Sequence, residues 1–323
     1  MEIPSVVLAP LAGGPSTPEL AAAVANAGGV GFVAGGYLTP DAFAAQLQHA
    51  RELTDGPLGA NVFVLEEQPV DEEAVAAYAL ELAGEGELGE PRFDDDWLDQ
   101  KAEAIFASGV EIISTTFGPP PAWLVEAARA AGLQVWATVA TVADARTAAA
   151  SGADVLVVQG LEAGGHRGSF DDLDETDLPL LALIADVRAA VSLPLVAAGG
   201  IADVIAAESA RAAGATAVQA GTAFLLCPEA GTYPVHRAAL ERGGETALTR
   251  AFTGRRARGI VNRFMRDHTD APSAYPQIHH LTAPLRAAAR AEGDADRVNL
   301  WAGSAFERVR ARPAAEVVAE LRP

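Results

Sequence analysis

One histidine lies where it could transfer a proton. His166 lies in the run Q-G-L-E-A-G-G-H-R-G, residues 159–168, directly after a short apolar stretch typical of a strand. A neutral imidazole near its usual pKa of about 6.5 can remove a proton from an acidic carbon, and an imidazolium can stabilise developing negative charge. The alternative is a loop histidine that only bonds a carbonyl group. We predict that His166 is the catalytic residue.

Two glycine-containing loops could bind a phosphate. Gly199 and Gly200 follow one predicted strand, and the run Gln219-Ala220-Gly221-Thr222 ends the next. Glycines let backbone N–H groups approach an anion closely, a following helix N-terminus adds partial positive charge, and the Thr222 hydroxyl can donate a hydrogen bond. Turn glycines are common, but two such loops on adjacent strands favour phosphate binding.

A flat backbone segment and an amide side chain could complete this site. Leu11, Ala12 and Gly13 follow the first predicted strand and could pass under a planar ring system. Asn61, in the third predicted strand, offers an amide to the same space, and Gln159 does so from the sixth.

The other candidate ligands do not indicate a metal site. His279 and His280 are adjacent, so their side chains point apart, and no carboxylate completes a ligand set. The single cysteine, Cys227, cannot form an internal disulfide or a thiolate cluster. Lys101 is the only lysine, and no Walker-type phosphate loop is present. We therefore predict no metal.

The elements that position these residues alternate in character along the chain. Short β-branched runs alternate with longer Ala/Leu/Glu/Arg stretches, which indicates repeated βα units around a parallel sheet. The predicted strands are Ser5–Ala9, Val30–Ala34, Gly59–Val64, Val110–Thr115, Gln134–Val139, Asp154–Gln159, Pro194–Ala198 and Thr216–Gln219. Eight strands favour an α/β (β/α)8 TIM barrel over a doubly wound sheet, and in a barrel the site lies at the carboxyl ends of the strands.

Capping residues mark the helices between these strands. Thr17-Pro18 and Thr39-Pro40 each combine an N-cap with a proline at the first helical position. Further helices are predicted near 120–131, 142–151, 177–190 and 202–213. The acidic segment 84–99 is interpreted as a solvated loop before a helix.

The βα rhythm stops after Leu226. We predict a TIM-barrel domain over residues 1–226 and a small accessory lobe over 227–300, made of loops and helices and inserted after the eighth strand. Residues 301–323 are predicted to be a tail whose helix packs back on the barrel.

Composition excludes several classes of protein. The 323 residues carry 23 Lys and Arg against 43 Asp and Glu, a net charge of −20, which argues against nucleic-acid or anionic-membrane binding. No apolar stretch reaches the length of a membrane span, and no basic leader is visible at the N-terminus. We expect a cytoplasmic protein, either a monomer or a homodimer.

At this point several motifs together resemble the nitronate monooxygenases, formerly called 2-nitropropane dioxygenases. The resemblance spans nearly the whole chain, and the Q-G-x-E-A-G-G-H run is its most specific part. The matching segments are 9–18, 31–38, 117–120, 159–168, 198–201, 219–224 and 258–262.

The resemblance implies an FMN-dependent barrel. Leu11, Ala12 and Gly13 would run beside the flavin, Asn61 and Gln159 would bond its polar edge, and His166 would be catalytic. The phosphate would be held by Gly164, Gly200, Gln219, Ala220, Gly221 and Thr222, and Gly165 and Gly199 are further predicted cofactor-binding residues.

The sequence departs from the family pattern at two positions, Leu11 beside the expected flavin and Ser304 near the expected substrate. Leu11 stands where Met is usual, a change that keeps the volume. Tyr275 resembles the family's tail and Ser304 stands where Gln is usual, so both are candidate substrate residues.

The implied reaction is oxidation of an alkyl nitronate, or of a nitroalkane, by FMN and O₂ to a carbonyl compound and nitrite. Two alternatives stay open. One is an FMN-dependent NAD(P)H reductase of the enoyl-acyl-carrier-protein or quinone type, and the other is a non-catalytic flavin-binding or phosphometabolite-binding barrel.

Overall fold

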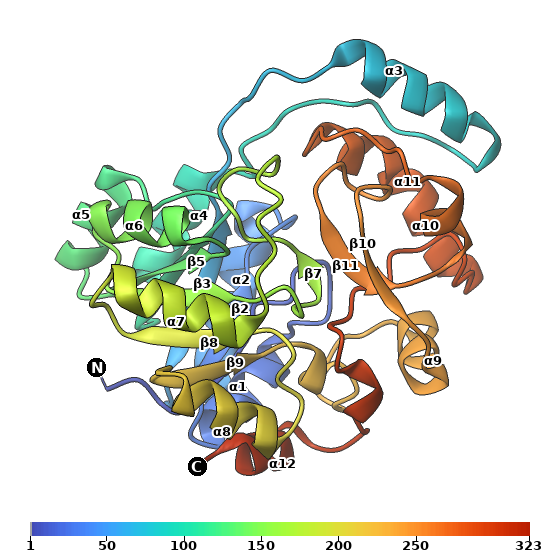
Figure 1. Ribbon diagram of the computed structural model, residues 1–323. Helices are drawn as coiled ribbons and strands as arrows, with labels where there is room; N and C mark the ends of the chain where they lie inside the picture. The colour runs from blue at the N-terminus through green and yellow to red at the C-terminus, as the bar shows by residue number, and fades with distance from the viewer. Residues whose placement is uncertain (1) are drawn as a thin grey trace.

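Eight parallel strands form a closed barrel in the computed structural model, which describes residues 2–323 (Figure 1). The strands are β1 (Val6–Leu8), β2 (Gly31–Ala34), β3 (Leu58–Phe63), β4 (Ile112–Thr116), β5 (Gln134–Val139), β6 (Val155–Gln159), β8 (Leu195–Ala198) and β9 (Ala217–Ala220). Their order is β1-β9-β8-β6-β5-β4-β3-β2. Val7 pairs in parallel with Val30, which joins the two ends of the sheet. The predicted TIM barrel is confirmed.

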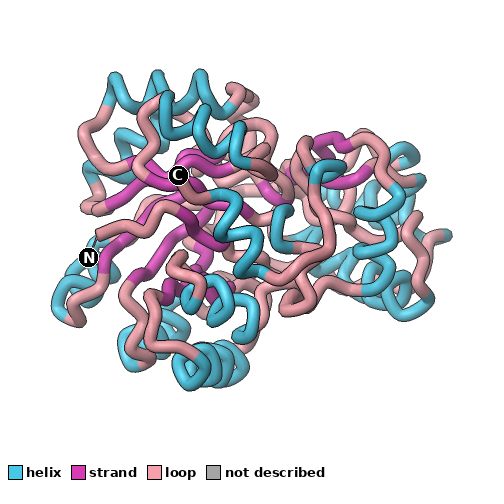
Figure 2. Tube along the Cα trace, turned by 90° about the horizontal axis from the view of Figure 1, so that it is seen from below, coloured by secondary structure: helices cyan, strands magenta, loops and turns pink. Residues whose placement is uncertain are grey.

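Helices cover the outside of the barrel (Figure 2). They are α1 (Pro18–Asn26), α2 (Pro40–Leu53), α4 (Leu98–Ala107), α5 (Ala122–Ala130), α6 (Val142–Ala150), α7 (Leu180–Ala190), α8 (Val204–Ala212) and α12 (Ala314–Leu321). The side chains of Thr17 and Thr39 accept hydrogen bonds from the Leu20 and Ala42 backbone N–H groups, as their N-cap positions predict. α12, from the end of the chain, packs against α1 and α8 and so takes the eighth helical position.

Two apolar layers stabilise the barrel. An inner layer of Val, Ile and aromatic side chains fills its interior, including Phe32 and Trp136, whose ring centroids lie 5.8 Å apart. An outer layer joins the strands to the surrounding helices. Both are fully buried, so the barrel is a packed core and the chemistry must lie at its ends.

A lobe lies beside the barrel and contains more β-structure than the sequence predicted. Its elements are α9 (Pro234–Arg242), β10 (Thr246–Thr249), β11 (Ala257–Ile260), α10 (Arg263–Asp267), α11 (Gln277–Glu292) and the short 3-10 turn η3 (Phe306–Arg308). Another 3-10 turn, η2 (Thr222–Phe224), follows β9 and packs in the barrel core. β10 and β11 form an antiparallel hairpin, where we predicted only loops and helices. β7 (Gly165–His166) adds the predicted histidine loop to this sheet.

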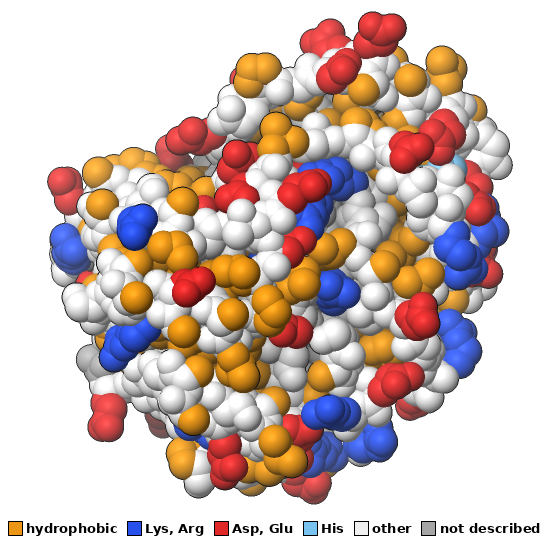
Figure 3. All heavy atoms as spheres, viewed as in Figure 1, with side chains coloured by type: hydrophobic (Ala, Val, Ile, Leu, Met, Phe, Trp, Pro, Cys, Tyr) orange, Lys and Arg blue, Asp and Glu red, His pale blue; other side chains and the backbone are white. Residues whose placement is uncertain are grey.

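The lobe also includes a segment that leaves the barrel after β3. α3 (Glu72–Glu81) and the 3-10 turn η1 (Leu82–Gly84) lie far from the other barrel helices, at the top of Figure 1. Val75, Tyr78 and Leu82 pack in one cluster with Phe252 and Ile278 of the lobe. The outer face of α3 carries exposed acidic side chains (Figure 3).

Candidate active site

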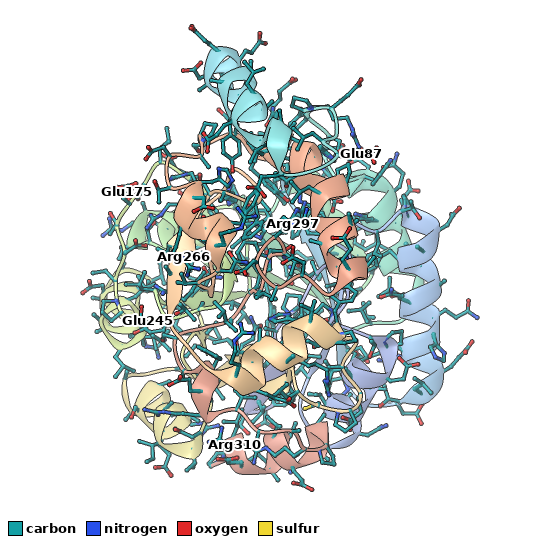
Figure 4. The ribbon with its side chains drawn as sticks, turned by 90° about the vertical axis from the view of Figure 1, so that its right-hand side faces the viewer. Glu87, Glu175, Glu245, Arg266, Arg297 and Arg310 are labelled. Atoms are coloured by element: carbon teal, nitrogen blue, oxygen red, sulfur yellow. The ribbon has the colours of Figure 1, made fainter. Side chains whose placement is uncertain are left out.

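A cavity of about 560 Å³ lies between the carboxyl ends of the barrel strands and the lobe. Side chains of α9 and α11 close it on the lobe side, and Figure 4 looks onto these helices from outside. Fourteen of the predicted residues line it: Leu11, Ala12, Gly13, Asn61, Gln159, Gly164, Gly165, His166, Gly199, Gly200, Gln219, Ala220, Gly221 and Thr222. Residues from the ends of five different barrel strands therefore converge on one space.

The glycines form a cradle that side chains would fill. A Cβ atom on Gly164 would lie 2.4 Å from the Gly303 nitrogen, and one on Gly200 would lie 3.0 Å from Glu162 Cβ. Gly200 has φ +70°, a conformation that few other residues adopt. The Thr222 hydroxyl oxygen accepts a hydrogen bond from Gly303 N–H (3.0 Å), so its proton can be donated into the cavity. These groups are the donors that a phosphate needs.

Asn61 and Gln159 are largely engaged by the protein itself. The Asn61 amide nitrogen donates to the Ser114 hydroxyl (2.8 Å) and the Thr116 hydroxyl (3.1 Å). Gln159 donates to the His166 carbonyl oxygen (3.0 Å) and accepts from Gly168 N–H (2.8 Å). Gln159 therefore fixes the loop that carries His166, a role that the sequence did not indicate.

His166 lies against aromatic rings with one nitrogen hydrogen-bonded. Its Nε2 is 2.9 Å from the Thr253 hydroxyl, which in turn lies 3.2 Å from the Arg255 carbonyl oxygen. Because Thr253 can donate to that carbonyl, it accepts the Nε2 proton, which leaves Nδ1 unprotonated. Burial, and then the charges of Arg255 and Arg286, lower the pKa of His166 to about 3. The imidazole is therefore neutral near pH 7.

The cavity lining is cationic. Among residues 2–323, no Asp or Glu side chain lines it, whereas Arg286 and Arg290 do. Arg286 is buried, and its Nε and Nη2 donate to the Thr282 hydroxyl (3.0 Å) and the His279 carbonyl oxygen (2.9 Å). In a chain of net charge −20, a cavity without carboxylates favours an anionic ligand.

An aromatic wall completes the cavity, and sequence reasoning missed it. The Tyr37 and His279 rings stack at 4.2 Å with an interplanar angle of 7°. Phe117 contacts His166, and its other side faces the Arg255 guanidinium at 4.2 Å. Tyr37 follows β2, Phe117 follows β4 and His279 lies on α11, so no local sequence pattern joins them.

The two predicted substrate residues lie outside the cavity lining. Tyr275 stands behind the wall, with its ring 5.6 Å from that of His166 and its hydroxyl 3.1 Å from the Tyr37 hydroxyl. Ser304 is exposed, and its backbone N–H donates to the Glu162 carbonyl oxygen (3.0 Å). Its neighbours Gly303 and Ala305 line the cavity instead.

Within the described residues, no group of three or more His, Cys, Asp or Glu side chains could hold a metal ion. His280 bonds Asp94, and His279 bonds Arg286. None of the helices described for residues 2–323 is long and apolar enough to cross a membrane.

Comparison with known proteins places this arrangement in a family. A family profile described as nitronate monooxygenase matches residues 1–323. A nitronate monooxygenase of Pseudomonas aeruginosa is 38% identical over 98% of this chain and 94% of its own. A probable nitronate monooxygenase of Bacillus subtilis is also 38% identical, over 92% of this chain and 89% of its own.

Solved structures show the same relationship. The structure of nitroalkane oxidase from Streptomyces ansochromogenes superposes with a TM-score of 0.95 and 44% identity, over 98% of this chain and 94% of that one. FabK from Thermotoga maritima superposes with a TM-score of 0.79 at 26% identity, over 99% of this chain and 92% of that one. The chain is an oxidoreductase and belongs to the nitronate monooxygenase family.

Proposed function

We propose that the protein oxidises alkyl nitronates with FMN and O₂, giving a carbonyl compound and nitrite. The observation that carries this proposal is the cavity lining, which combines two arginines with a neutral imidazole and, over residues 2–323, contains no carboxylate. A nitronate is an anion, and such a lining favours its binding over that of a cation. The names of the relatives support the same substrate class.

The cradle fits the phosphate of FMN. The Thr222 hydroxyl and the backbone N–H groups around Gly164, Gly200 and Gly221 would hold the phosphate, and Leu11 to Gly13 would lie beside the ring system. When bound, FMN accepts electrons from the substrate.

The chain's own residues would bind and orient the substrate. Arg286 Nη1 has no hydrogen bond among residues 2–323, so it can donate to a nitronate oxygen, and Arg290 is a second cation in the lining. The rings of Tyr37, Phe117 and Trp301 would exclude water around the reacting carbon. A nitronate has already lost its α-proton and needs no base. For a neutral nitroalkane, His166 Nδ1 would take that proton.

One rival is an FMN-dependent NAD(P)H reductase, the alternative that the sequence leaves open. A non-catalytic flavin-binding barrel is the second rival. His166 does not separate these alternatives, because a reductase of the same fold can carry the same loop.

Anaerobic stopped-flow mixing of the purified yellow protein tests the proposal. Ethyl nitronate and propionate 3-nitronate are each expected to bleach the flavin absorbance, and NADH and NADPH are not. In air, nitrite should form together with the carbonyl product. Bleaching by NADH or NADPH without nitronate turnover would identify a reductase. No bleaching by either class would identify the non-catalytic barrel.

A further inference from the structure

The predicted loop before a helix contains an acidic turn, defined here as residues 94–96, of which Asp95 is exposed, Asp94 is partly buried and Asp96 is buried. It lies on the return path from α3 to α4, where the chain passes between barrel and lobe. Asp96 is 5% exposed, and its partner Lys101, the only lysine of the chain, is fully buried. Asp96 Oδ2 lies 2.7 Å from Lys101 Nζ.

Asp96 fixes one side of the aromatic wall. Its Oδ1 accepts a hydrogen bond from the Tyr37 backbone N–H (3.0 Å). Tyr37 has φ +68°, a left-handed conformation that a non-glycine residue keeps only when its surroundings hold it there. The bond from Asp96 supplies that restraint, and the Tyr37 side chain then lines the cavity.

Asp94 fixes the other side. Its Oδ2 lies 2.7 Å from His280 Nε2, and its Oδ1 accepts from Asp96 N–H (3.2 Å). His280 follows His279 on α11, and the His279 ring stacks on Tyr37. The acidic turn therefore contacts both sides of the Tyr37–His279 stack. Asp96 bonds the Tyr37 backbone in a barrel loop, and Asp94 contacts His280, the neighbour of His279 in the lobe.

His279 is also bonded to Arg286, one of the two arginines that line the cavity. Arg286 donates to the His279 carbonyl oxygen (2.9 Å) and lies 3.2 Å from His279 Nδ1 through Nη2. A shift of α11 at His280 would therefore move His279 and Arg286 together.

We propose that Asp94 and Asp96 are positioning residues that hold the Tyr37–His279 wall, and with it Arg286, at the spacing that binds the anionic substrate. This inference rests on the proposed function for the identity of the substrate. Neither carboxylate lines the cavity, so the turn acts on substrate affinity and not on the reacting atoms.

Asp95 provides a matched control. It belongs to the same turn, carries the same charge and caps a backbone group, since its Oδ1 accepts from Trp97 N–H (3.0 Å). It is exposed, and no hydrogen bond or ion pair within residues 2–323 joins it to the wall. Asp94→Ala and Asp95→Ala therefore remove equal charge from one turn but differ in contact with α11.

The test compares steady-state kinetics of these flavin-loaded variants with propyl-1-nitronate. Asp94→Ala is expected to raise KM about fivefold or more, the effect of losing one or two ordinary hydrogen bonds, with kcat within about twofold. Asp95→Ala should change both constants by less than about twofold. Asp94→Asn keeps an acceptor for Asp96 N–H and a partner for His280, and should recover most of the affinity.

Binding of butyrate, a non-reacting carboxylate of similar shape, provides a readout independent of turnover. Its Kd, followed by the change in flavin absorbance, should rise by the same factor in Asp94→Ala. In a double-mutant cycle, adding His280→Gln to Asp94→Ala should cause little further loss of butyrate affinity, because each substitution alone already breaks the Asp94–His280 contact.

Equal effects of Asp94→Ala and Asp95→Ala on butyrate affinity and KM would overturn the proposal, as would a fall in kcat with KM unchanged. If Asp94→Ala does not retain flavin, the butyrate Kd of Asp94→Asn and His280→Gln tests the proposal instead. Absence of nitronate turnover in the parent would refute the proposed function alone, because the butyrate comparison still tests the turn.

Discussion

Replacing His166 with glutamine is expected to separate two kinds of nitro substrate. Glutamine is similar in size and can still donate to the Thr253 hydroxyl, but it cannot take up a proton. The specificity constant kcat/KM for neutral nitroethane should fall about 10²-fold or more, the usual contribution of a positioned general base. For ethyl nitronate it should fall much less, because the proton has already left.

The pKa of His166 adds a second, quantitative expectation. A base works only when unprotonated, and a histidine of pKa 6.5 is about 90% protonated at pH 5.5, which would reduce its activity roughly tenfold. Burial and two nearby arginines lower the pKa of His166 to about 3. The ring therefore stays unprotonated from pH 8 down to pH 5. The rate of nitroethane turnover should not decline around pH 6.5, as it would with an ordinary histidine base.

Oxygen-consumption rates between pH 5 and 8 measure both the substrate dependence of His166→Gln and the pH dependence of the parent. Nitroethane is added from an acidic stock and ethyl nitronate from an alkaline one. His49→Gln, on the exposed face of α2, makes the same substitution away from the cavity and should behave like the parent. A loss near pH 6.5 that disappears in His166→Gln would refute the lowered pKa. Equal nitroethane rates in His166→Gln and the parent would refute the assignment as base, and loss of flavin would make the histidine structural.

Two further predictions concern cofactor and stability. Gly200→Asp places a carboxylate in the proposed phosphate cradle and should weaken FMN binding to the apoprotein at least about 10²-fold by fluorescence titration, while Gly132→Asp, at a similar positive φ in open space, should not. Retained affinity in Gly200→Asp would place the phosphate elsewhere. Burial lowers the pKa of His236 to about 4, below its unfolded value near 6.5, so its contribution to stability is present above pH 6.5 and is lost as pH falls toward 4. Between pH 7.5 and pH 5.5 the free energy of unfolding in urea should fall by about 1 kcal/mol less in His236→Gln than in the parent. An equal fall in both proteins would contradict the lowered pKa of His236.

The barrel could be predicted because its signals are local. Each strand is a short β-branched run, and Thr17-Pro18 and Thr39-Pro40 begin helices through contacts within four residues. The glycine loops and His166 could be predicted as one site for a related reason. The carboxyl ends of parallel barrel strands meet at one end, so residues distant in sequence are brought together by the fold itself.

The lobe side of the cavity could not be predicted in this way. α3 joins the lobe through Tyr78, whose hydroxyl donates to the Ala251 carbonyl oxygen (2.7 Å) across 173 residues. Arg286 belongs to α11, whose sequence is that of an ordinary amphipathic helix. Nothing in that sequence predicts that Arg286 lies over the ends of the barrel strands. The burial of Asp96 could not be predicted, because a run of aspartates usually faces solvent, as Asp95 does. The only available signal was the single lysine, five residues after Asp96.

The largest failures of local reasoning coincide with the cavity wall. Among residues 2–323, four non-glycine residues have a left-handed φ: Tyr37, Asp96, Trp97 and Phe117. Tyr37 and Phe117 line the cavity, Asp96 ends the acidic turn and bonds Tyr37, and Trp97 directly follows that turn. Asp96 and Trp97 are capped by aspartates two residues earlier, whereas Tyr37 is bonded by Asp96 and Phe117 contacts His166 and Arg255. The contacts of Tyr37 and Phe117 form only after barrel and lobe have come together. Because the wall exists only in that assembled state, the spacing that selects the substrate is a property of the contact between barrel and lobe.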